Sequence, residues 1–147
     1  MGRLVPRARR RWPGLPFRRL SVAIGITFDA GGLIALERSD RRVLALLGRA
    51  REQGAELLVP ATVLAQVLRA PARQVLLMRL LRHPRTTVVA LDRADASFVG
   101  QLLAVSSTAD LAGAHVVVCA RRARHAVVTS DGDDLRRLDP NLTLVEV

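Results

Sequence analysis

The stretch IGITFDAGGLIALE, residues 24–37, decides the fold of this chain. Residues 24–28 are predicted to form a short buried strand, and Asp29 follows where that strand should end. Ala30, Gly31 and Gly32 predict a tight turn, after which residues 33–37 begin a helix. In open parallel sheets, a carboxylate after the first strand faces the crevice in which ligands bind. The number of other acids that reach this edge therefore decides whether the chain has a metal site.

Predicted strands and helices alternate along the rest of the chain. The first strand extends back to Val22, and further strands are predicted at residues 56–59, 86–91, 126–130 and 142–147. Helices are predicted at residues 41–53, 60–69, 72–81, 94–105, 110–120 and 131–138. This alternation is typical of a parallel sheet covered by helices on both faces. We expect a three-layer α/β domain over residues 21–147, with about five short strands.

The composition favours one globular domain in a reducing compartment. The chain has 147 residues, of which 50% are hydrophobic, which is enough to bury a core without covalent cross-links. Its single cysteine, Cys119, cannot form a disulfide framework, so we expect a cytoplasmic protein. No apolar run approaches the roughly 20 residues of a membrane span. We therefore expect no membrane-spanning segment in this sequence.

The basic charge is concentrated at the N-terminus. The net charge is +10, but residues 1–20 hold seven arginines and no acid. The other 127 residues carry 16 arginines against 13 acids, or +3. We expect residues 1–20 to be a disordered Arg- and Pro-rich leader. A nucleic-acid-binding arm and a translation start assigned too far upstream are the other interpretations; a targeting leader is disfavoured because no apolar segment or cleavage site follows.

The chain contains no lysine, which excludes several activities. A phosphate-binding P-loop depends on a lysine that reaches the phosphates, and Schiff-base catalysis needs a lysine amine. Nucleotide hydrolysis of that type and imine chemistry are therefore excluded.

Oxygen ligands gather, in the predicted topology, at one edge of the sheet. Asp29 and Asp131 both follow buried strands, and Asp133 lies two residues beyond Asp131. Asp110 opens the helix before the fourth strand, and Gln66 lies on the helix after the second. Because the carboxyl ends of parallel strands share one edge, we expect these side chains to converge. Such a set suits a hard cation such as Mg²⁺.

Four stretches carry a resemblance to a known family: FDAGGLIALE, VPATVLAQVLR, TADLAGAHVVVCA and AVVTSDGDDLRRL. Together they resemble the PIN-domain family, and more narrowly the VapC-type toxins of toxin–antitoxin pairs. The resemblance covers residues 24–138. It implies a PIN-like fold, an endoribonuclease that depends on Mg²⁺ or Mn²⁺, a homodimer, and a cognate antitoxin that inhibits it.

The resemblance also implies roles for individual acids. Asp29 matches the first aspartate of the family, and Asp131 matches the aspartate of the T-x-D stretch. Asp133 matches a frequent acid two residues further on. With Asp110, these residues form the predicted metal site, and Asp29, Asp110 and Asp131 are the predicted catalytic set.

Two positions depart from the family pattern. Gln66 stands where the family has a glutamate, and Gly113 stands where a third acid usually opens a helix. Asp110, three residues before Gly113, is our candidate to replace that acid. Glu37 could also line the site, although a solvated acid at a helix end is the simpler interpretation. These departures keep a second hypothesis open, in which the domain binds RNA or an antitoxin without cleaving.

Other residues have competing interpretations. Asp110 and Asp131 stand where helices start, so they could be helix caps in an unrelated α/β domain, our third hypothesis. His115 and Cys119 lie four apart on one helix, which suggests a metal pair, but without a third ligand in reach by sequence we predict core packing. His83 and His125 are predicted to be exposed. Arg69 and Arg73 are the predicted RNA contacts near Gln66, and most other arginines are predicted to form a solvated face.

Overall fold

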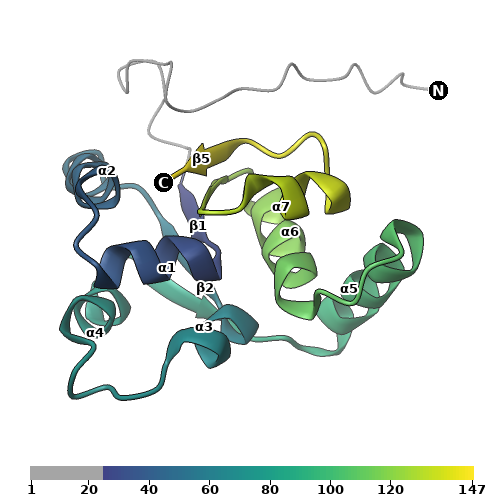
Figure 1. Ribbon diagram of the computed structural model, residues 1–147, viewed down its shortest axis with the longest axis horizontal. Coiled ribbons are helices and arrows are strands. Elements are labelled where there is room, and N and C mark those ends of the chain that lie inside the picture. The colour runs from purple at the N-terminus through teal and green to yellow at the C-terminus, as the bar shows by residue number, and fades with distance from the viewer. Residues whose placement is uncertain (1–24) are drawn as a thin grey trace.

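The sheet is entirely parallel, with the strand order β3-β2-β1-β4-β5. The computed structural model describes residues 25–147, and the predicted leader lies outside this range (Figure 1). The strands are β1 (Ile26–Phe28), β2 (Leu57–Pro60), β3 (Thr86–Val89), β4 (Ala126–Thr129) and β5 (Leu144–Glu146). The predicted α/β architecture is therefore confirmed.

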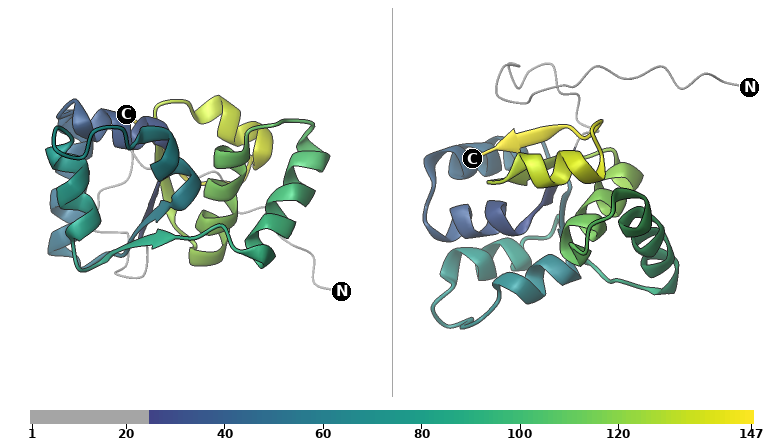
Figure 2. Two further views of the ribbon diagram at one scale, coloured as in Figure 1. Left: turned by 90° about the horizontal axis from the view of Figure 1, so that it is seen from below. Right: turned by 45° about the vertical axis from the view of Figure 1, so that its right-hand side comes forward.

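Helices cover both faces of the sheet and give three layers. They are α1 (Ala30–Glu37), α2 (Arg41–Glu52), α3 (Ala61–Val67), α4 (Val75–Arg82), α5 (Arg93–Ser106), α6 (Leu111–Ala123) and α7 (Gly132–Leu138). In Figure 1, α1, α2 and α4 lie on one side of the sheet, while α5, α6 and α7 lie on the other. Figure 2 shows α5 outside α6, so α6 is the helix that contacts the strands on this side. This arrangement is a PIN-like fold.

The chain reverses its direction of travel across the sheet beside β1. From β1 it moves through β2 to β3 at one edge, then returns through α5 and α6 to place β4 on the other side of β1. The pairing of β1 with β4 aligns Ile26 with Ala126 and Phe28 with Val128. Such a switch point opens a crevice at the carboxyl ends of the two strands, where ligands bind in open α/β sheets.

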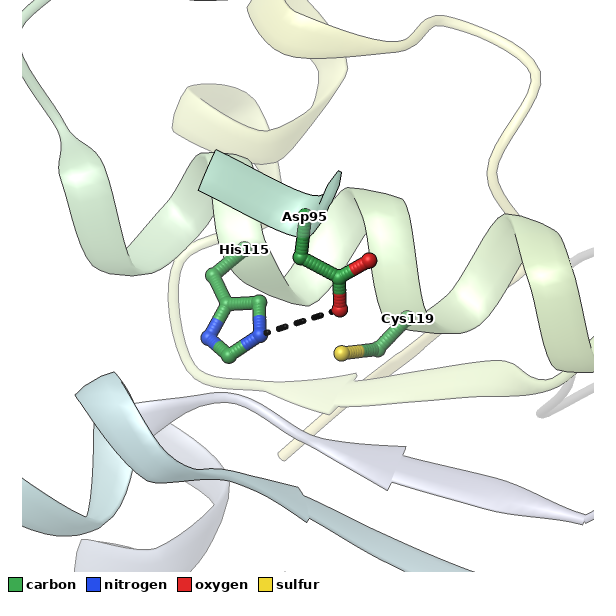
Figure 3. Close-up of side chains that lie close together, drawn as sticks. All are labelled: Asp95, His115 and Cys119. Atoms are coloured by element: carbon green, nitrogen blue, oxygen red, sulfur yellow. Dashed lines mark ion pairs between the residues drawn. The ribbon is translucent and has the colours of Figure 1, made fainter. Parts of the chain in front are cut away.

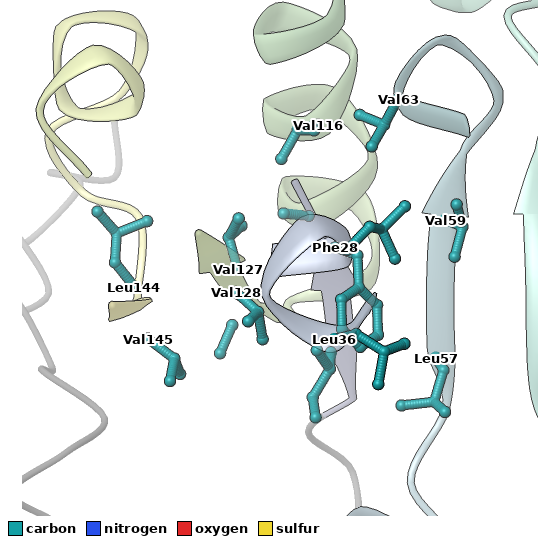
Figure 4. Close-up of a cluster of buried hydrophobic side chains, with 14 of the residues drawn as sticks. Phe28, Leu36, Leu57, Val59, Val63, Val116, Val127, Val128, Leu144 and Val145 are labelled. Atoms are coloured by element: carbon teal, nitrogen blue, oxygen red, sulfur yellow. The ribbon is translucent and has the colours of Figure 1, made fainter. Parts of the chain in front are cut away.

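The core consists of the central strands and the helix faces that pack on them. Figure 4 shows Phe28 among aliphatic side chains from β2, β4 and α1, and Val116 of α6 closes the core on the other side of the sheet. Phe28 and Val116 are fully buried. Because β1, β2 and β4 are buried on both faces, their residues are mostly apolar, and the two polar residues among them, Thr27 and Thr129, are buried as well.

The predicted turn at Ala30, Gly31 and Gly32 is wrong, because these residues form the first turn of α1. The glycines serve close packing instead. A Cβ on Gly31 would lie 2.0 Å from the Ser130 hydroxyl, and one on Gly32 would lie 2.5 Å from the Val128 carbonyl oxygen. Neither glycine has a positive φ angle. The double glycine therefore lets α1 approach the end of β4.

Helix boundaries around residues 68–74 also differ from prediction. The helix predicted at residues 60–69 ends at Val67, and the one predicted at residues 72–81 begins at Val75. The side-chain oxygen of Gln74 accepts hydrogen bonds from the backbone N–H groups of Arg69 and Ala70, and its amide donates to the Val67 carbonyl. One side chain thus stabilises the connection in place of helical backbone bonds.

His125 is buried, which contradicts the prediction of exposure. Its ring lies 3.2 Å from the Thr27 hydroxyl and 3.5 Å from a Glu56 carboxylate oxygen. Burial lowers the pKa of His125, and the nearby Glu56 carboxylate opposes that shift. His83 is half-buried, and its ring accepts from the Arg85 backbone N–H. The prediction of exposure rested on the place of His125 after a helix, and the sequence did not show that this residue packs beneath the start of β1.

In residues 25–147, no individual helix combines the length and apolar character needed to cross a membrane. The pair α5 and α6 meets that test when taken together, but the two helices meet at a bend of 114°.

Two glycine substitutions should have opposite effects on stability. We expect Gly32→Ala to lower the free energy of unfolding by about 1–3 kcal/mol, because the new methyl group collides with the backbone of β4. Gly48→Ala in α2 has open space around its Cβ, so it should raise stability by about 0.5–1 kcal/mol. Urea unfolding of both variants tests the packing; equal effects would contradict it.

Candidate active site

Asp29 lies directly after β1 and at the N-terminus of α1. Its side chain makes no capping hydrogen bond to that helix. Instead, its Oδ2 accepts a hydrogen bond of 2.8 Å from the buried hydroxyl of Thr129 at the end of β4. The Asp29 backbone N–H donates to the Val128 carbonyl at 3.0 Å. Both bonds tie Asp29 to the switch point between β1 and β4.

The environment of Asp29 disfavours its charged form. Burial raises the pKa of its carboxyl group, and the negative charges of Asp110 and Asp131 raise the pKa further. The hydrogen bonds from Thr129 and from the Ala30 backbone act in the opposite direction. Asp110 and Asp131 therefore lie near enough for their charges to act on Asp29. Raised carboxyl pKa values of this origin are typical of functional sites.

Asp131 follows β4, as the sequence predicted, and its exposed carboxylate makes no capping bond to α7. Its backbone N–H donates to Thr129 Oγ1 at 3.0 Å. The Thr129 hydroxyl therefore accepts from the Asp131 backbone while it donates to Asp29. Sequence reasoning did not assign this positioning role to Thr129. Its place two residues before Asp131, in a strand that pairs with β1, was the available signal.

Asp110 caps α6 and also takes the place of a missing acid. Its Oδ1 accepts a 2.9 Å hydrogen bond from the Gly113 backbone N–H. A Cβ on Gly113 would lie 2.1 Å from Asp110 Oδ2. The Asp110 carboxylate thus fills the space into which a side chain at position 113 would project. Asp110 therefore caps α6, and its charge also acts on Asp29.

The acids at the sheet edge do not form a compact set of three ligand atoms. Across residues 25–147, three donor atoms of His, Cys, Asp or Glu come within 4.8 Å of one another only between α5 and α6, in Asp95, His115 and Cys119. The carboxylates of Asp29, Asp110 and Asp131 are therefore more widely separated. Mg²⁺ retains several waters and reaches some of its protein ligands through them. The donor set fits such a hard cation, and it lacks the nitrogen and sulfur atoms that softer metals prefer.

Two predicted ligands have other surroundings. The carboxylate of Asp133 receives a 2.8 Å bond from Arg136, and its side chain is 86% exposed. Arg136 also bonds Glu146 of β5, so Asp133 belongs to an ion-pair group on α7. Gln66 is exposed on α3. The roles of Asp133 as a metal ligand and of Gln66 in lining the site therefore stay predictions.

Glu37 lies at the far end of α1 from Asp29. Eight residues of helix separate their Cα atoms by roughly 12 Å. The Glu37 carboxylate accepts a hydrogen bond from the Gln74 amide, which places it beside the connection between α3 and α4. This position favours a structural role for Glu37 over one in lining the acid site.

The predicted RNA contacts lie on that same connection. Arg69 is exposed, and its guanidinium donates to the carbonyl oxygens of Ala65 and Leu68 at the end of α3. Arg73 is also exposed. Neither arginine is paired with a carboxylate among the described ion pairs, so both keep their charge available to an anion.

Removing the Thr129 hydroxyl should raise the pKa of Asp29 further. Thr129→Val keeps the shape of the side chain but loses the donor that stabilises the carboxylate. It should also cost about 1–3 kcal/mol of stability, because the Asp131 backbone N–H loses its acceptor. Titration of the Asp29 carboxyl carbon by NMR measures the change. Thr129→Ser, which retains the hydroxyl, is the control; equal pKa values in the two variants would refute the bridge.

Comparison with known proteins identifies a likeness of fold. No family model and no curated protein sequence matches this chain. Among solved structures, FitAcB from Neisseria gonorrhoeae is similar, with a TM-score of 0.56 and 16% sequence identity. The match covers 82% of this chain and 96% of the other. At this identity the comparison supports the fold, and it agrees with the PIN-like arrangement of the sheet and helices.

Proposed function

We propose that this protein is a metal-dependent endoribonuclease of the PIN type, the toxin component of a toxin–antitoxin pair. The observation that supports the proposal is that Asp29 and Asp131 follow two paired strands and are joined through the Thr129 hydroxyl at the switch point of the sheet, where the charge of Asp110 also acts on Asp29. The likeness of fold to FitAcB supports a toxin–antitoxin PIN module. The resemblance of the four sequence stretches to VapC-type toxins supports the same assignment.

The acids would hold Mg²⁺ or Mn²⁺, directly or through water. When bound, such an ion lowers the pKa of a coordinated water and stabilises negative charge on a phosphoryl oxygen. Asp29 is held by Thr129 and the β4 backbone, so its carboxylate has a fixed place at the centre of the set. Asp110 and Asp131 stand on two other elements and approach it from the starts of α6 and α7. The three carboxylates would thus hold a divalent ion at the carboxyl ends of β1 and β4.

RNA binding would use the mild positive charge of the domain. Residues 21–147 carry an excess of three positive charges in spite of the acids at the site. Arg69 and Arg73 are exposed on the connection that follows α3, the helix on which Gln66 lies. Phosphate contacts of this kind contribute affinity without sequence specificity. We therefore assign these arginines to the RNA backbone.

The proposed partners are a cognate antitoxin and a second copy of this chain. Both follow from the resemblance to VapC-type toxins. The proposed location is the cytoplasm, where the single cysteine would remain reduced and RNA is available.

A second candidate function is binding of RNA or an antitoxin without cleavage. Two observations favour it: Gly113 and Gln66 replace acids, and the remaining carboxylates are more widely spaced than a compact ligand set. Fewer carboxylates weaken the hold on a divalent ion, and a second ion would be affected most. The two candidates differ in whether a metal-dependent cut is made.

Asp29→Asn should abolish cleavage. The change keeps the size of the side chain but removes the central negative charge, so we expect a loss of roughly 100-fold or more in the rate of metal-dependent RNA cleavage. The measurement is cleavage of a labelled single-stranded RNA pool with Mn²⁺ and with Mg²⁺, and with a chelator as blank.

Asp134→Asn is the matched control, because Asp134 is exposed on α7 and pairs with Arg137. It should cleave at the wild-type rate. Cleavage that persists in Asp29→Asn refutes the proposed site. RNA binding by the folded wild type without metal-dependent cleavage would instead establish the second candidate.

Gly113→Asp should tighten Mn²⁺ binding. The new carboxylate restores a charge to the site, and it must displace Asp110 Oδ2 from the space it now occupies. The metal-free variant should therefore lose about 1 kcal/mol of stability with the disturbed cap. Calorimetric titration with Mn²⁺ gives the affinity. Gly113→Asn has nearly the same shape without the charge; if both variants bind Mn²⁺ equally well, position 113 does not contribute charge to the site.

A further inference from the structure

A second set of potential metal ligands, which shares no residue with the acids described above, is buried between α5 and α6. Asp95 of α5 is 1% exposed, and His115 and Cys119 of α6 are 0% and 2% exposed. The burial of the two α6 residues confirms that they pack in the core. The sequence analysis did not identify Asp95 as their neighbour. Figure 3 shows the three side chains directed toward one another.

We propose that Asp95, His115 and Cys119 form a binding site for a borderline-soft divalent cation of the Zn²⁺ type. One donor atom from each residue lies within 4.8 Å of the other two. His115 Nε2 and Asp95 Oδ2 are 3.9 Å apart. Ligands around a tetrahedral zinc ion are roughly 3.3–3.8 Å apart, given bonds of about 2.0–2.3 Å. Small movements of the side chains would therefore enclose an ion.

The orientation of His115 favours ligation. Its Nδ1 lies 2.8 Å from the hydroxyl of Thr62 on α3, while its Nε2 is buried and has no hydrogen-bond partner among the described residues. If Nδ1–H donates to Thr62, the lone pair of Nε2 faces Asp95. Metal-binding histidines typically use their other ring nitrogen in this way, since that bond fixes both tautomer and ring orientation. An ion at the site would satisfy the unpartnered nitrogen.

Arg122 holds Asp95 without closing the site. The guanidinium bonds Asp95 Oδ1 through Nη2, and its Nη1 reaches Oδ2 at a longer 3.3 Å. Oδ2 is the oxygen that faces His115. The Arg122 side chain is 55% exposed, so it can move away from Oδ2 and retain Oδ1. Its role would be that of an outer partner that orients a ligating carboxylate.

The donor types select the class of ion. Thiolate and imidazole ligands favour Zn²⁺ over Mg²⁺, which prefers oxygen atoms alone. Burial raises the pKa of the Cys119 thiol to about 11. The ion must therefore displace the thiol proton, which passes to the buffer when the metal–sulfur bond forms. This site differs in chemistry from the acid site and does not depend on the proposed nuclease function.

Cobalt substitution tests the proposal on the full chain. Co²⁺ bound to a thiolate gives a charge-transfer band in the near ultraviolet, and Cys119 is the only cysteine in the sequence. We expect the metal-free, reduced protein to bind one Co²⁺ per chain with this band, and Zn²⁺ to displace it. Zn²⁺ should also raise the unfolding temperature by on the order of 5 °C at saturation. Absence of the band in the folded wild type overturns the proposal without any variant.

Variants separate this site from the acid site. Cys119→Ser should abolish the band, and His115→Gln should weaken Co²⁺ binding at least tenfold. Thr62→Val removes only the outer partner of His115 and should weaken binding by about 10–100-fold. Asp29→Asn is the control, because no sulfur lies among the acids and the band should be unchanged. A band that survives in His115→Gln and in Asp95→Asn at wild-type affinity would refute this ligand set, whatever the outcome for RNA cleavage.

Discussion

The parallel pairing of β1 with β4 is the constraint on which the acid site depends. The two strands run in the same direction and are in register from Ile26 and Ala126 to Phe28 and Val128, so they end at the same level. Adjacent strands are about 4.8 Å apart. The residues that follow them therefore start from neighbouring positions, although they are a hundred residues apart in the chain. The Thr129 hydroxyl then joins the two ends through Asp29 Oδ2 and the Asp131 backbone N–H.

Gathering carboxylates in a partly buried place is unfavourable, and the fold offsets part of that cost. Asp29 and Asp110 stand at the N-termini of α1 and α6, where the positive ends of the helix dipoles favour negative charge. Asp110 also satisfies a backbone N–H of its helix. Helix capping and metal ligation were competing interpretations in the sequence. In the structure they are compatible, because a helix N-terminus aimed at the sheet edge presents its cap to the site.

Local sequence patterns predicted the order of the strands and helices. The features that they did not predict depend on contacts between residues that are distant in the sequence. Alternating apolar segments were sufficient for the parallel sheet and for the edge that carries Asp29 and Asp131. The prediction of a turn at Gly31 and Gly32 was wrong because a glycine pair is compatible both with a turn and with a helix that packs closely on a strand. Only the position of β4 shows which of the two applies. Asp95 escaped notice for a similar reason. An acid in the first turn of a helix suggests a solvated face, whereas the packing of α5 on α6 buries it.

Helix α6 carries residues of both proposed sites, and its packing explains how Asp110 occupies the space beside Gly113. It lies against strands on one side and against α5 on the other, and nearly all of Ala112–Ala120 is buried. A helix packed so closely cannot shift to bring a different residue toward Asp29. The place vacated by the side chain missing at Gly113 is filled instead from the preceding turn, by the flexible carboxylate of Asp110. The packing of α6 thus fixes the space beside Gly113 into which the Asp110 carboxylate projects.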